Sequence, residues 1–313
     1  MTNVVATRFR NRLLVYSISS MIFSGVCAQP LEDTESAGEK SPSLEYQRDI
    51  AYGSRSEQKL DLCFNAKAPG ARPGLILIHG GGWTHGSKTV MTTVCKNFAS
   101  MGYIVANVEY RLANRTNQLS RWPAQLLDVQ LAVRWLRHNA KMLGLDAKRI
   151  CAIGNSAGGQ LAMFLGMMDA PARGAAEGSS LSQYSSKVQC VISISGPTDL
   201  ATIGAEFQDV ISGPLFGGVR PEENISPYKA ASPLYSVSKK AAPMLLIYGT
   251  DDKIVPISQA LLLSSSLQEH GVNARMLQYN GGHLMIGINM KERQEIFHSM
   301  VQFLREHLGP IGN

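Results

Sequence analysis

A serine lies between two glycines where an apolar run gives way to a helical pattern, in RICAIGNSAGGQLAMFLG at residues 149–166. The segment GNSAG (154–158) has the G-x-S-x-G spacing of a nucleophile elbow, in which a strained turn exposes the serine hydroxyl. A helix that begins at Ser156 would favour negative charge developing beside it. Because the same spacing also arises by chance, a serine that only caps the helix is the alternative.

A nucleophilic serine needs a base and an acid that orients the base, and α/β folds with this elbow supply them in the order serine, acid, histidine. Asp251 and Asp252 follow the apolar run PMLLIYG, and His283 lies in QYNGGHLM after the last strand pattern. Both segments would lie at the carboxyl edge of a sheet, where open α/β folds bind ligands. The histidines in or beside helix patterns fit less well: His138, His270, His298 and His307.

A third segment, HGGGW at residues 79–83, directly follows the apolar run GLILI. Its glycines allow backbone N–H groups to point at an oxyanion with no side chain in the way. The predicted donors are the N–H groups of Gly81, Gly82 and Ala157. A phosphate-binding interpretation is disfavoured, because no Gly-Lys-Ser/Thr follows and GxGxxG is absent. The three segments together indicate nucleophilic attack on a carbonyl group.

Apolar runs that alternate with helical patterns must position these residues. A hairpin (YQRDIAYG, QKLDLCFN) is followed by six further strand patterns: GLILIHG, YIVANVEY, RICAIGN, VQCVISISG, PMLLIYG and ARMLQY. This alternation predicts one α/β domain over residues 46–310, a mostly parallel eight-stranded sheet with helices on both faces. Residues 197–242 exceed a simple crossover and predict a small cap of short helices. Residues 170–187 predict a surface excursion.

The N-terminus has the form of a secretory signal peptide over residues 1–28, with cleavage after Ala28. An uncleaved N-terminal anchor is the alternative. Residues 29–45 are polar and predict a flexible leader. The net charge of the 313 residues is +6, and residues 1–28 contribute three arginines and no acid. The remaining bases are scattered, which disfavours a nucleic-acid partner. We expect a secreted or periplasmic protein.

Four cysteines follow the signal. Cys63 and Cys95 could form a disulfide in an oxidising compartment, but the sequence does not decide whether they do. Cys151 and Cys190 lie inside apolar strand patterns and are interpreted as buried free thiols.

Several motifs in one order make a family resemblance. HGGGW (79–83), EYRL (109–112), GNSAGG (154–159), SGPTDL (195–200) and GTDDKIVP (249–256) resemble those of the α/β-hydrolase superfamily. The similar branch contains hormone-sensitive-lipase-like and acetylxylan/feruloyl-esterase-like carboxylesterases. The resemblance extends from about Leu60 to the C-terminus. It implies an α/β-hydrolase fold whose reaction needs no metal and no organic cofactor.

The resemblance also implies roles for single residues. Ser156 corresponds to the nucleophile, His283 to the general base and Asp252 to the acid, with Asp251 as the rival acid. Trp83 is placed at the mouth of the substrate pocket, and Asp199 is assigned to the same pocket.

The implied function is that of a serine carboxylesterase acting on short-chain or carbohydrate-linked esters, of acetyl or feruloyl type, through an acyl-enzyme. An amidase or formamidase, or a small serine peptidase on the same fold, is the alternative. A non-catalytic ligand-binding protein is a more remote one. The expected partner is a small or polysaccharide-linked ester, and the oligomeric state stays open.

Overall fold

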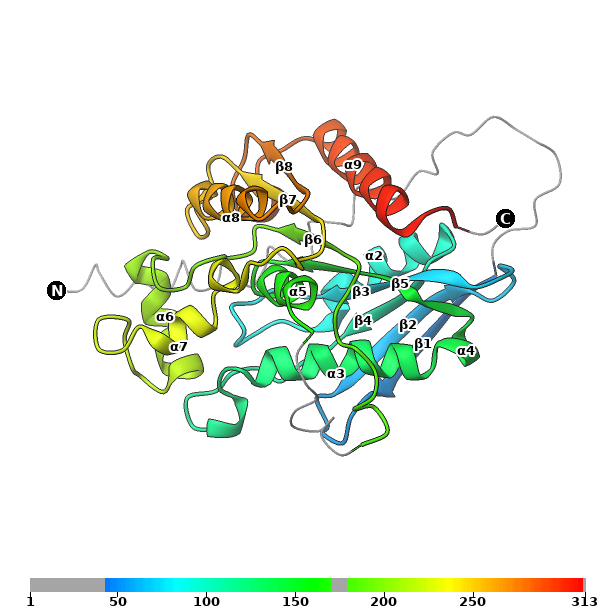
Figure 1. Cartoon of the computed structure of the whole chain (residues 1–313), viewed down its shortest axis with the longest axis horizontal. Coiled ribbons are helices and arrows are strands. Elements are labelled where there is room, and N and C mark those ends of the chain that lie inside the picture. Colours follow the sequence, from blue (N-terminus) through cyan, green and yellow to red (C-terminus); the bar gives the residue numbers. More distant parts are fainter. Residues whose placement is uncertain (1–42, 170–178, 312–313) are drawn as a thin grey trace.

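The strands predicted from the apolar runs form one sheet in the computed structural model, which describes residues 43–169 and 179–311 (Figure 1). The strand order is β1-β2-β4-β3-β5-β6-β7-β8; the β1–β2 and β2–β4 pairs are antiparallel, and every other neighbouring pair is parallel. The predicted α/β-hydrolase fold with a mostly parallel eight-stranded sheet is confirmed. The bounds are Leu44–Ala51 (β1), Lys59–Asn65 (β2), Arg72–Ile78 (β3), Ile104–Val108 (β4), Leu145–Asn155 (β5), Cys190–Ile194 (β6), Met244–Gly249 (β7) and Ala274–Tyr279 (β8).

Some predictions lie outside the described residues. These are the signal peptide over 1–28, nearly all of the leader over 29–45, and residues 170–178 of the surface excursion. Among the residues that the structure describes, no helix combines the length and the apolar character that a bilayer crossing requires.

Helices cover both faces of the sheet (Figure 1). Strands β3, β4, β6 and β7 are buried at every residue, as continuous apolar runs predict. Within β3, Ile76 and Ile78 face one core and Leu75 and Leu77 the other, because successive side chains of a strand alternate. The first core is covered by Ala124–His138 (α3), Ala157–Met167 (α5) and Ile257–Glu269 (α8); the second is covered by Thr92–Ser100 (α2) and Met290–Leu308 (α9).

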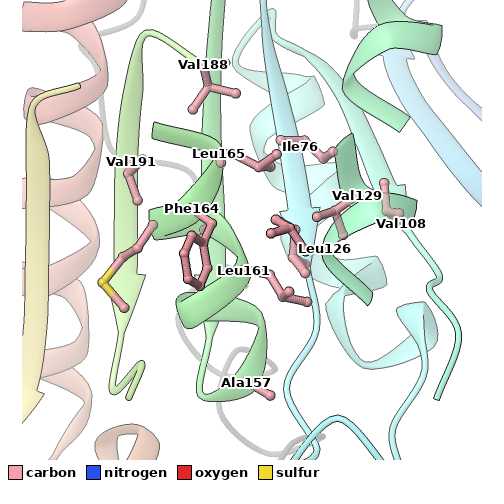
Figure 2. Packing of buried hydrophobic residues seen from close by; sticks show 14 of the residues in the cluster. Ile76, Val108, Leu126, Val129, Ala157, Leu161, Phe164, Leu165, Val188 and Val191 are labelled. Carbon is pink, nitrogen blue, oxygen red and sulfur yellow. The ribbon is translucent and has the colours of Figure 1, made fainter. Parts of the chain in front are cut away.

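Helix α5 is the element that carries the serine motif, and it is buried along its whole length. Leu161, Phe164 and Leu165 pack into the first core, where Leu126 and Val129 of α3 also lie (Figure 2). Burying each large apolar side chain stabilises the fold by about 1.5–3 kcal/mol. The helix that follows Ser156 is therefore held rigidly against the sheet.

Two helices lie between β4 and β5 in the segment 123–144. Helix α3 ends at His138, and a short helix, Ala140–Leu143 (α4), ends at Gly144 in the left-handed region (φ 65°). The segment 197–242, which we call the cap, contains Ala205–Phe216 (α6), Ser226–Ala230 (α7) and a 3-10 segment, Pro233–Ser236.

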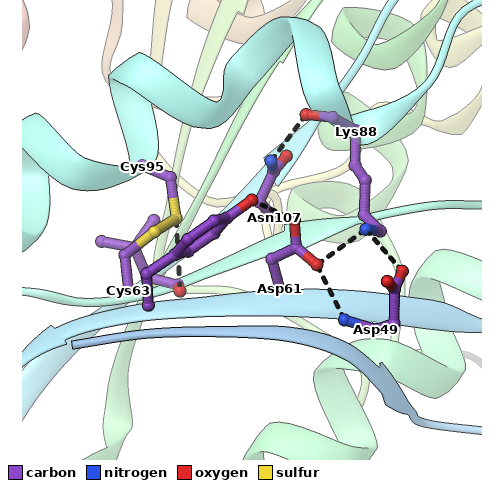
Figure 3. The surroundings of a disulfide bond; sticks show 8 residues. Asp49, Asp61, Cys63, Lys88, Cys95 and Asn107 are labelled. Atoms are coloured by element: carbon purple, nitrogen blue, oxygen red, sulfur yellow. Dashed lines mark hydrogen bonds and ion pairs between the residues drawn. A yellow bond between two sulfur atoms is a disulfide. The ribbon is translucent and has the colours of Figure 1, made fainter.

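Two disulfides cross-link the described residues. Cys63 of β2 pairs with Cys95 of α2, with a Cα–Cα distance of 5.8 Å (Figure 3). Cys151 of β5 pairs with Cys190 of β6, with a Cα–Cα distance of 4.7 Å. The interpretation of Cys151 and Cys190 as free thiols is therefore wrong. The register of the two parallel strands places these cysteines directly opposite each other.

An ionic network centred on the buried side chains of Lys88 and Asp61 lies beside the first disulfide (Figure 3). Lys88 Nζ contacts Asp61 Oδ1 at 2.7 Å and Asp49 Oδ1 at 2.9 Å, and Tyr46 donates to the other Asp61 oxygen. The side chain of Asn107 donates to the Lys88 carbonyl at 2.6 Å. The network ties the segment after HGGGW to the N-terminal hairpin.

Candidate active site

Ser156 stands on a sharp turn between β5 and α5. Its φ of 52° lies in a region that residues with a side chain rarely adopt. Its N–H donates to the carbonyl of Ile194 on β6 at 2.8 Å, and its carbonyl accepts from Gln160 N at 3.2 Å. Its side chain makes no cap hydrogen bond to the helix. The strained backbone of the predicted elbow is therefore present, and the simple capping interaction is not.

The glycines around Ser156 permit close backbone approaches. A Cβ on Gly158 would collide with the carbonyl oxygen of Ile78 at the end of β3. A Cβ on Gly154 would collide with the carbonyl oxygen of Gly158, and one on Gly159 would approach the Cα of Gly196 to 3.0 Å. Hydrogen is the only side chain that these positions accept without a backbone shift.

Ser156, His283 and Asp252 form a continuous hydrogen-bonded chain. His283 Nε2 lies 3.0 Å from Ser156 Oγ, and His283 Nδ1 lies 2.7 Å from Asp252 Oδ2. All three residues are buried: 6% of Ser156, 4% of Asp252 and 9% of His283 is exposed. With Nδ1 donating to the carboxylate, Nε2 has a lone pair that can accept the serine proton.

Of the two candidate acids, Asp252 contacts His283 and Asp251 does not. Asp252 Oδ1 accepts from the N–H groups of Ile254 and Val255, each at 2.9 Å. These bonds aim the second oxygen at the imidazole. Asp251 is exposed, and its N–H donates to the carbonyl of Gly281 at 3.0 Å.

The glycines of HGGGW lie against the elbow. A Cβ on Gly80 would lie 3.1 Å from Ser156 Cβ and 2.8 Å from the Asn155 carbonyl oxygen. Gly81 has a φ of 122° and Gly82 a φ of 58°. Within residues 43–169 and 179–311, the N–H groups of Gly81, Gly82 and Ala157 donate to no protein acceptor. Unpaired N–H groups beside a nucleophile are the donors that an oxyanion hole requires.

His79, to which no role is assigned from the sequence, contacts this glycine loop. His79 Nδ1 lies 2.7 Å from the Gly80 carbonyl oxygen and His79 Nε2 lies 3.0 Å from Glu109 Oε1. The Tyr110 ring stacks on the imidazole at 4.3 Å, and its hydroxyl donates to the His79 carbonyl. Burial raises the pKa of Tyr110, so the phenol keeps its proton. The contacts with His79 could have been predicted from the motif EYRL, because Glu109 and Tyr110 both follow a buried strand.

Trp83 is completely buried, whereas the sequence placed it at the mouth of the pocket. Its ring packs edge-on against Phe207 of α6, with 6.1 Å between ring centroids. Its indole N–H donates to Gln160 Oε1 at 3.1 Å, and Gln160 Nε2 donates to the Ala231 carbonyl at 2.8 Å. The buried amide of Gln160 thus joins the glycine loop, the serine helix and the cap. Phe207 brings the cap helix α6 into contact with the buried Trp83 ring.

Asp199 is part of the hydrogen-bonded framework of the cap. Its carboxylate accepts from Ala201 N, the Thr202 hydroxyl and the Tyr235 hydroxyl at 3.0–3.2 Å, and from the Ser232 hydroxyl at 3.4 Å. It is 2% exposed. These bonds hold the residues after β6 to the 3-10 segment of the cap, and the pocket role of Asp199 stays a prediction.

The fold and this grouping of residues are those of the α/β-hydrolase superfamily, as the sequence motifs implied. Residues 60–267 match the sequence profile of the family described as BD-FAE. The chain therefore belongs to the BD-FAE family, whose members are α/β-hydrolase-type esterases.

Individual relatives agree with this assignment. The chain is 30% identical over 221 residues to esterase LipC of Mycobacterium tuberculosis. The matched region covers 69% of this chain and 53% of LipC. The chain therefore spans about half the length of that relative. It is 29% identical over 252 residues to ethyl acetate hydrolase of Pseudomonas putida, covering 76% of this chain and 74% of the relative. The acetyl ester-xyloside bifunctional hydrolase of Caldicellulosiruptor lactoaceticus superposes with a TM-score of 0.66 at 25% identity, covering 79% of this chain and 88% of that structure.

Proposed function

We propose that this protein is a serine carboxylesterase that hydrolyses short-chain or carbohydrate-linked carboxylic esters through an acyl-enzyme. The observation that carries the proposal is the hydrogen-bonded chain from Ser156 through His283 to Asp252 beside the unpaired N–H groups. Nucleophile, base, orienting acid and oxyanion donors are the four parts that acyl transfer needs.

In the first half of the reaction, Ser156 Oγ attacks the ester carbonyl carbon while His283 Nε2 takes the hydroxyl proton. The carbonyl oxygen becomes an oxyanion, which the N–H groups of Gly81, Gly82 and Ala157 stabilise. Asp252 stabilises the imidazolium that forms. His283 then protonates the leaving alkoxide, the alcohol departs, and the acyl group stays on Ser156.

In the second half, water takes the place of the alcohol. His283 accepts a proton from the water as its oxygen attacks the acyl carbon, and the same N–H groups stabilise the second oxyanion. Collapse of this intermediate breaks the bond to Ser156 Oγ, and His283 returns the proton to the serine. The products are a carboxylic acid and an alcohol, and the enzyme is regenerated.

The enclosure of the site supports a small acyl group. Ser156 is 6% exposed and Trp83 is covered by α6, so little open surface surrounds the nucleophile. The ethyl acetate hydrolase relative is named for an ester of a two-carbon acid. The Caldicellulosiruptor hydrolase is described as acting on an acetyl ester and a xyloside, which supports carbohydrate-linked acetyl groups.

The two disulfides support export, because such bonds persist in oxidising compartments. We therefore propose secretion through the signal peptide over residues 1–28. Identifying the N-terminal residue of the mature protein tests this proposal.

Initial rates on p-nitrophenyl acetate, butyrate, octanoate and palmitate test the activity, with acetylated xylan, methyl ferulate and an acetanilide in parallel. We expect the acetate and butyrate esters to react fastest. We expect the octanoate rate to be lower by about tenfold or more. A clash between the longer acyl chain and the enclosing side chains costs about 1–3 kcal/mol, which has that effect on the rate. Faster hydrolysis of palmitate would refute the short-chain preference. Hydrolysis of the anilide alone would replace the esterase with an amidase.

The oxyanion loop gives a prediction of its own. Gly81→Ala should lower kcat on p-nitrophenyl acetate by about 10²–10³-fold, the effect of losing one oxyanion donor. The added Cβ would collide with the His85 carbonyl oxygen at a φ of 122°, so the Gly81 N–H must move. Gly82→Ala is the matched variant, because its φ is 58° and no atom lies within 4 Å of the added Cβ. Its kcat should fall by less than about tenfold. Equal losses in both folded variants would contradict this account.

A further inference from the structure

The loop that carries His283 contains two successive left-handed residues, and neither is glycine. Leu284 has a φ of 55° and Met285 a φ of 65°. This backbone is unfavourable for residues with a side chain, and it persists only where surrounding contacts over-determine it. Both side chains are buried. The position of His283 therefore depends on groups outside the loop that hold the backbone of the loop in place.

The hydroxyl of Tyr279 supplies such contacts on both sides of His283. It accepts from Met285 N at 2.8 Å and lies 3.0 Å from the Gly282 carbonyl oxygen, to which it donates. Ser195 lies 3.4 Å from the same hydroxyl, and its Oγ lies 3.4 Å from Leu284 N. One phenol thus contacts the residue before the histidine and the second residue after it.

The sheet orients Tyr279 for this role. Tyr279 ends β8 and pairs with Gly249, the last residue of β7. A Cβ on Gly249 would lie 2.8 Å from both the Tyr279 ring and the Gly282 carbonyl oxygen, so the glycine makes room for the ring and the loop. Thr250 N donates to the Tyr279 carbonyl at 2.9 Å. The loop with the acid and the loop with the base are therefore joined through this residue.

Tyr279 is a neutral donor in this setting. Burial raises the pKa of its phenol, and only 6% of the residue is exposed. The protonated hydroxyl can donate to the Gly282 carbonyl and accept from Met285 N at the same time.

We propose that Tyr279 is a positioning residue for ester hydrolysis, which clamps the strained loop and so holds His283 between Ser156 and Asp252. The inference rests on the proposed function. Tyr279 has no hydrogen bond to the imidazole or to Ser156 among the described residues, so it acts through the loop backbone alone.

Tyr279→Phe keeps the ring and removes the hydroxyl. We expect kcat on p-nitrophenyl acetate to fall by about 10–100-fold, because a base displaced by about 1 Å loses that much. KM should stay within about twofold, since substrate contacts are unchanged. The rate of Ser156 phosphonylation by a p-nitrophenyl phosphonate should fall by the same factor as kcat. The far-downfield resonance of the proton on His283 Nδ1 is assigned by its absence from the spectrum of Asp252→Asn. In Tyr279→Phe this resonance should broaden or vanish.

Tyr103→Phe is the matched control. The Tyr103 hydroxyl is buried, and it has no hydrogen-bond partner in the part of the chain that the structure describes. Its removal should leave kcat, the phosphonylation rate and the resonance unchanged. If Tyr279→Phe does not fold, Ser195→Ala, which removes the hydroxyl that contacts Tyr279 and Leu284, must lower kcat at constant KM.

Two failures are distinguishable. A wild-type protein that neither hydrolyses esters nor reacts with the phosphonate would refute the proposed function, and the resonance would still decide whether Tyr279 positions His283. An active wild type with a Tyr279→Phe variant of equal kcat and an unchanged resonance would overturn the role of Tyr279 alone.

Discussion

Replacing Ser156 by alanine should lower kcat on p-nitrophenyl acetate by about 10⁴–10⁶-fold, because the variant has no nucleophile to form an acyl-enzyme. The residual rate would come from oxyanion stabilisation of direct attack by water. The loss should appear in kcat with little change in KM, since the serine hydroxyl contributes little to ground-state binding. Stopped-flow rates on wild type and variant measure it, and mass spectrometry after phosphonate treatment should show a label on the wild type only.

Ser193→Ala is the control for this substitution. Ser193 is a buried serine on β6, next to the strand that leads into the elbow. Its loss should leave turnover close to that of the wild type. A Ser156→Ala protein that retained a tenth of the wild-type rate would exclude Ser156 as the nucleophile and would return its motif to a structural role.

Asp252→Asn should lower kcat by about 10⁴-fold, although the change replaces one oxygen by an NH₂ group. The N–H groups of Ile254 and Val255 need an acceptor, so the asparagine oxygen will stay with them. The amide NH₂ must then face His283 Nδ1, which forces that nitrogen to become an acceptor. The ring proton moves to Nε2 and points at Ser156, where it blocks proton abstraction. A pre-steady-state assay of acylation measures the loss.

Asp251→Asn tests whether the adjacent acid contributes. Asp251 is exposed and makes no contact with the imidazole in the described part of the chain, so its substitution should change kcat by no more than about twofold. A large loss in Asp251→Asn together with an active Asp252→Asn would reverse the assignment and would require a different loop conformation in solution.

Much of the fold could be predicted because its signals are local. Each buried strand is a continuous apolar run, and the polar residues at its carboxyl end are visible as the points where the run stops. Ser156, Asp252 and His283 all lie at such points. The choice between Asp251 and Asp252 needed the family resemblance. Neighbouring residues on one loop have the same sequence context, and they differ only in the direction in which the side chain points.

Other features depend on the pairing of distant segments and leave no local trace. The disulfide between Cys151 and Cys190 joins residues 39 positions apart, and it depends on strand register. The burial of Trp83 depends on where α6 lies, and the contacts of Asp199 depend on the same cap. Tyr279 ends an ordinary strand pattern, and nothing in the sequence shows that Leu284 is left-handed.

The glycines on either side of Ser156 have a consequence for the evolution of this fold. Gly154 and Gly158 allow the backbone of β3, the elbow and α5 to pass within contact of one another, and Gly159 does the same beside Gly196. None of these requirements involves the hydroxyl. A descendant that lost Ser156, and with it all hydrolytic activity, would still need every one of these glycines to fold. The glycine pattern therefore reports on the architecture alone, and the serine, aspartate and histidine must be found together before a relative is counted as an enzyme.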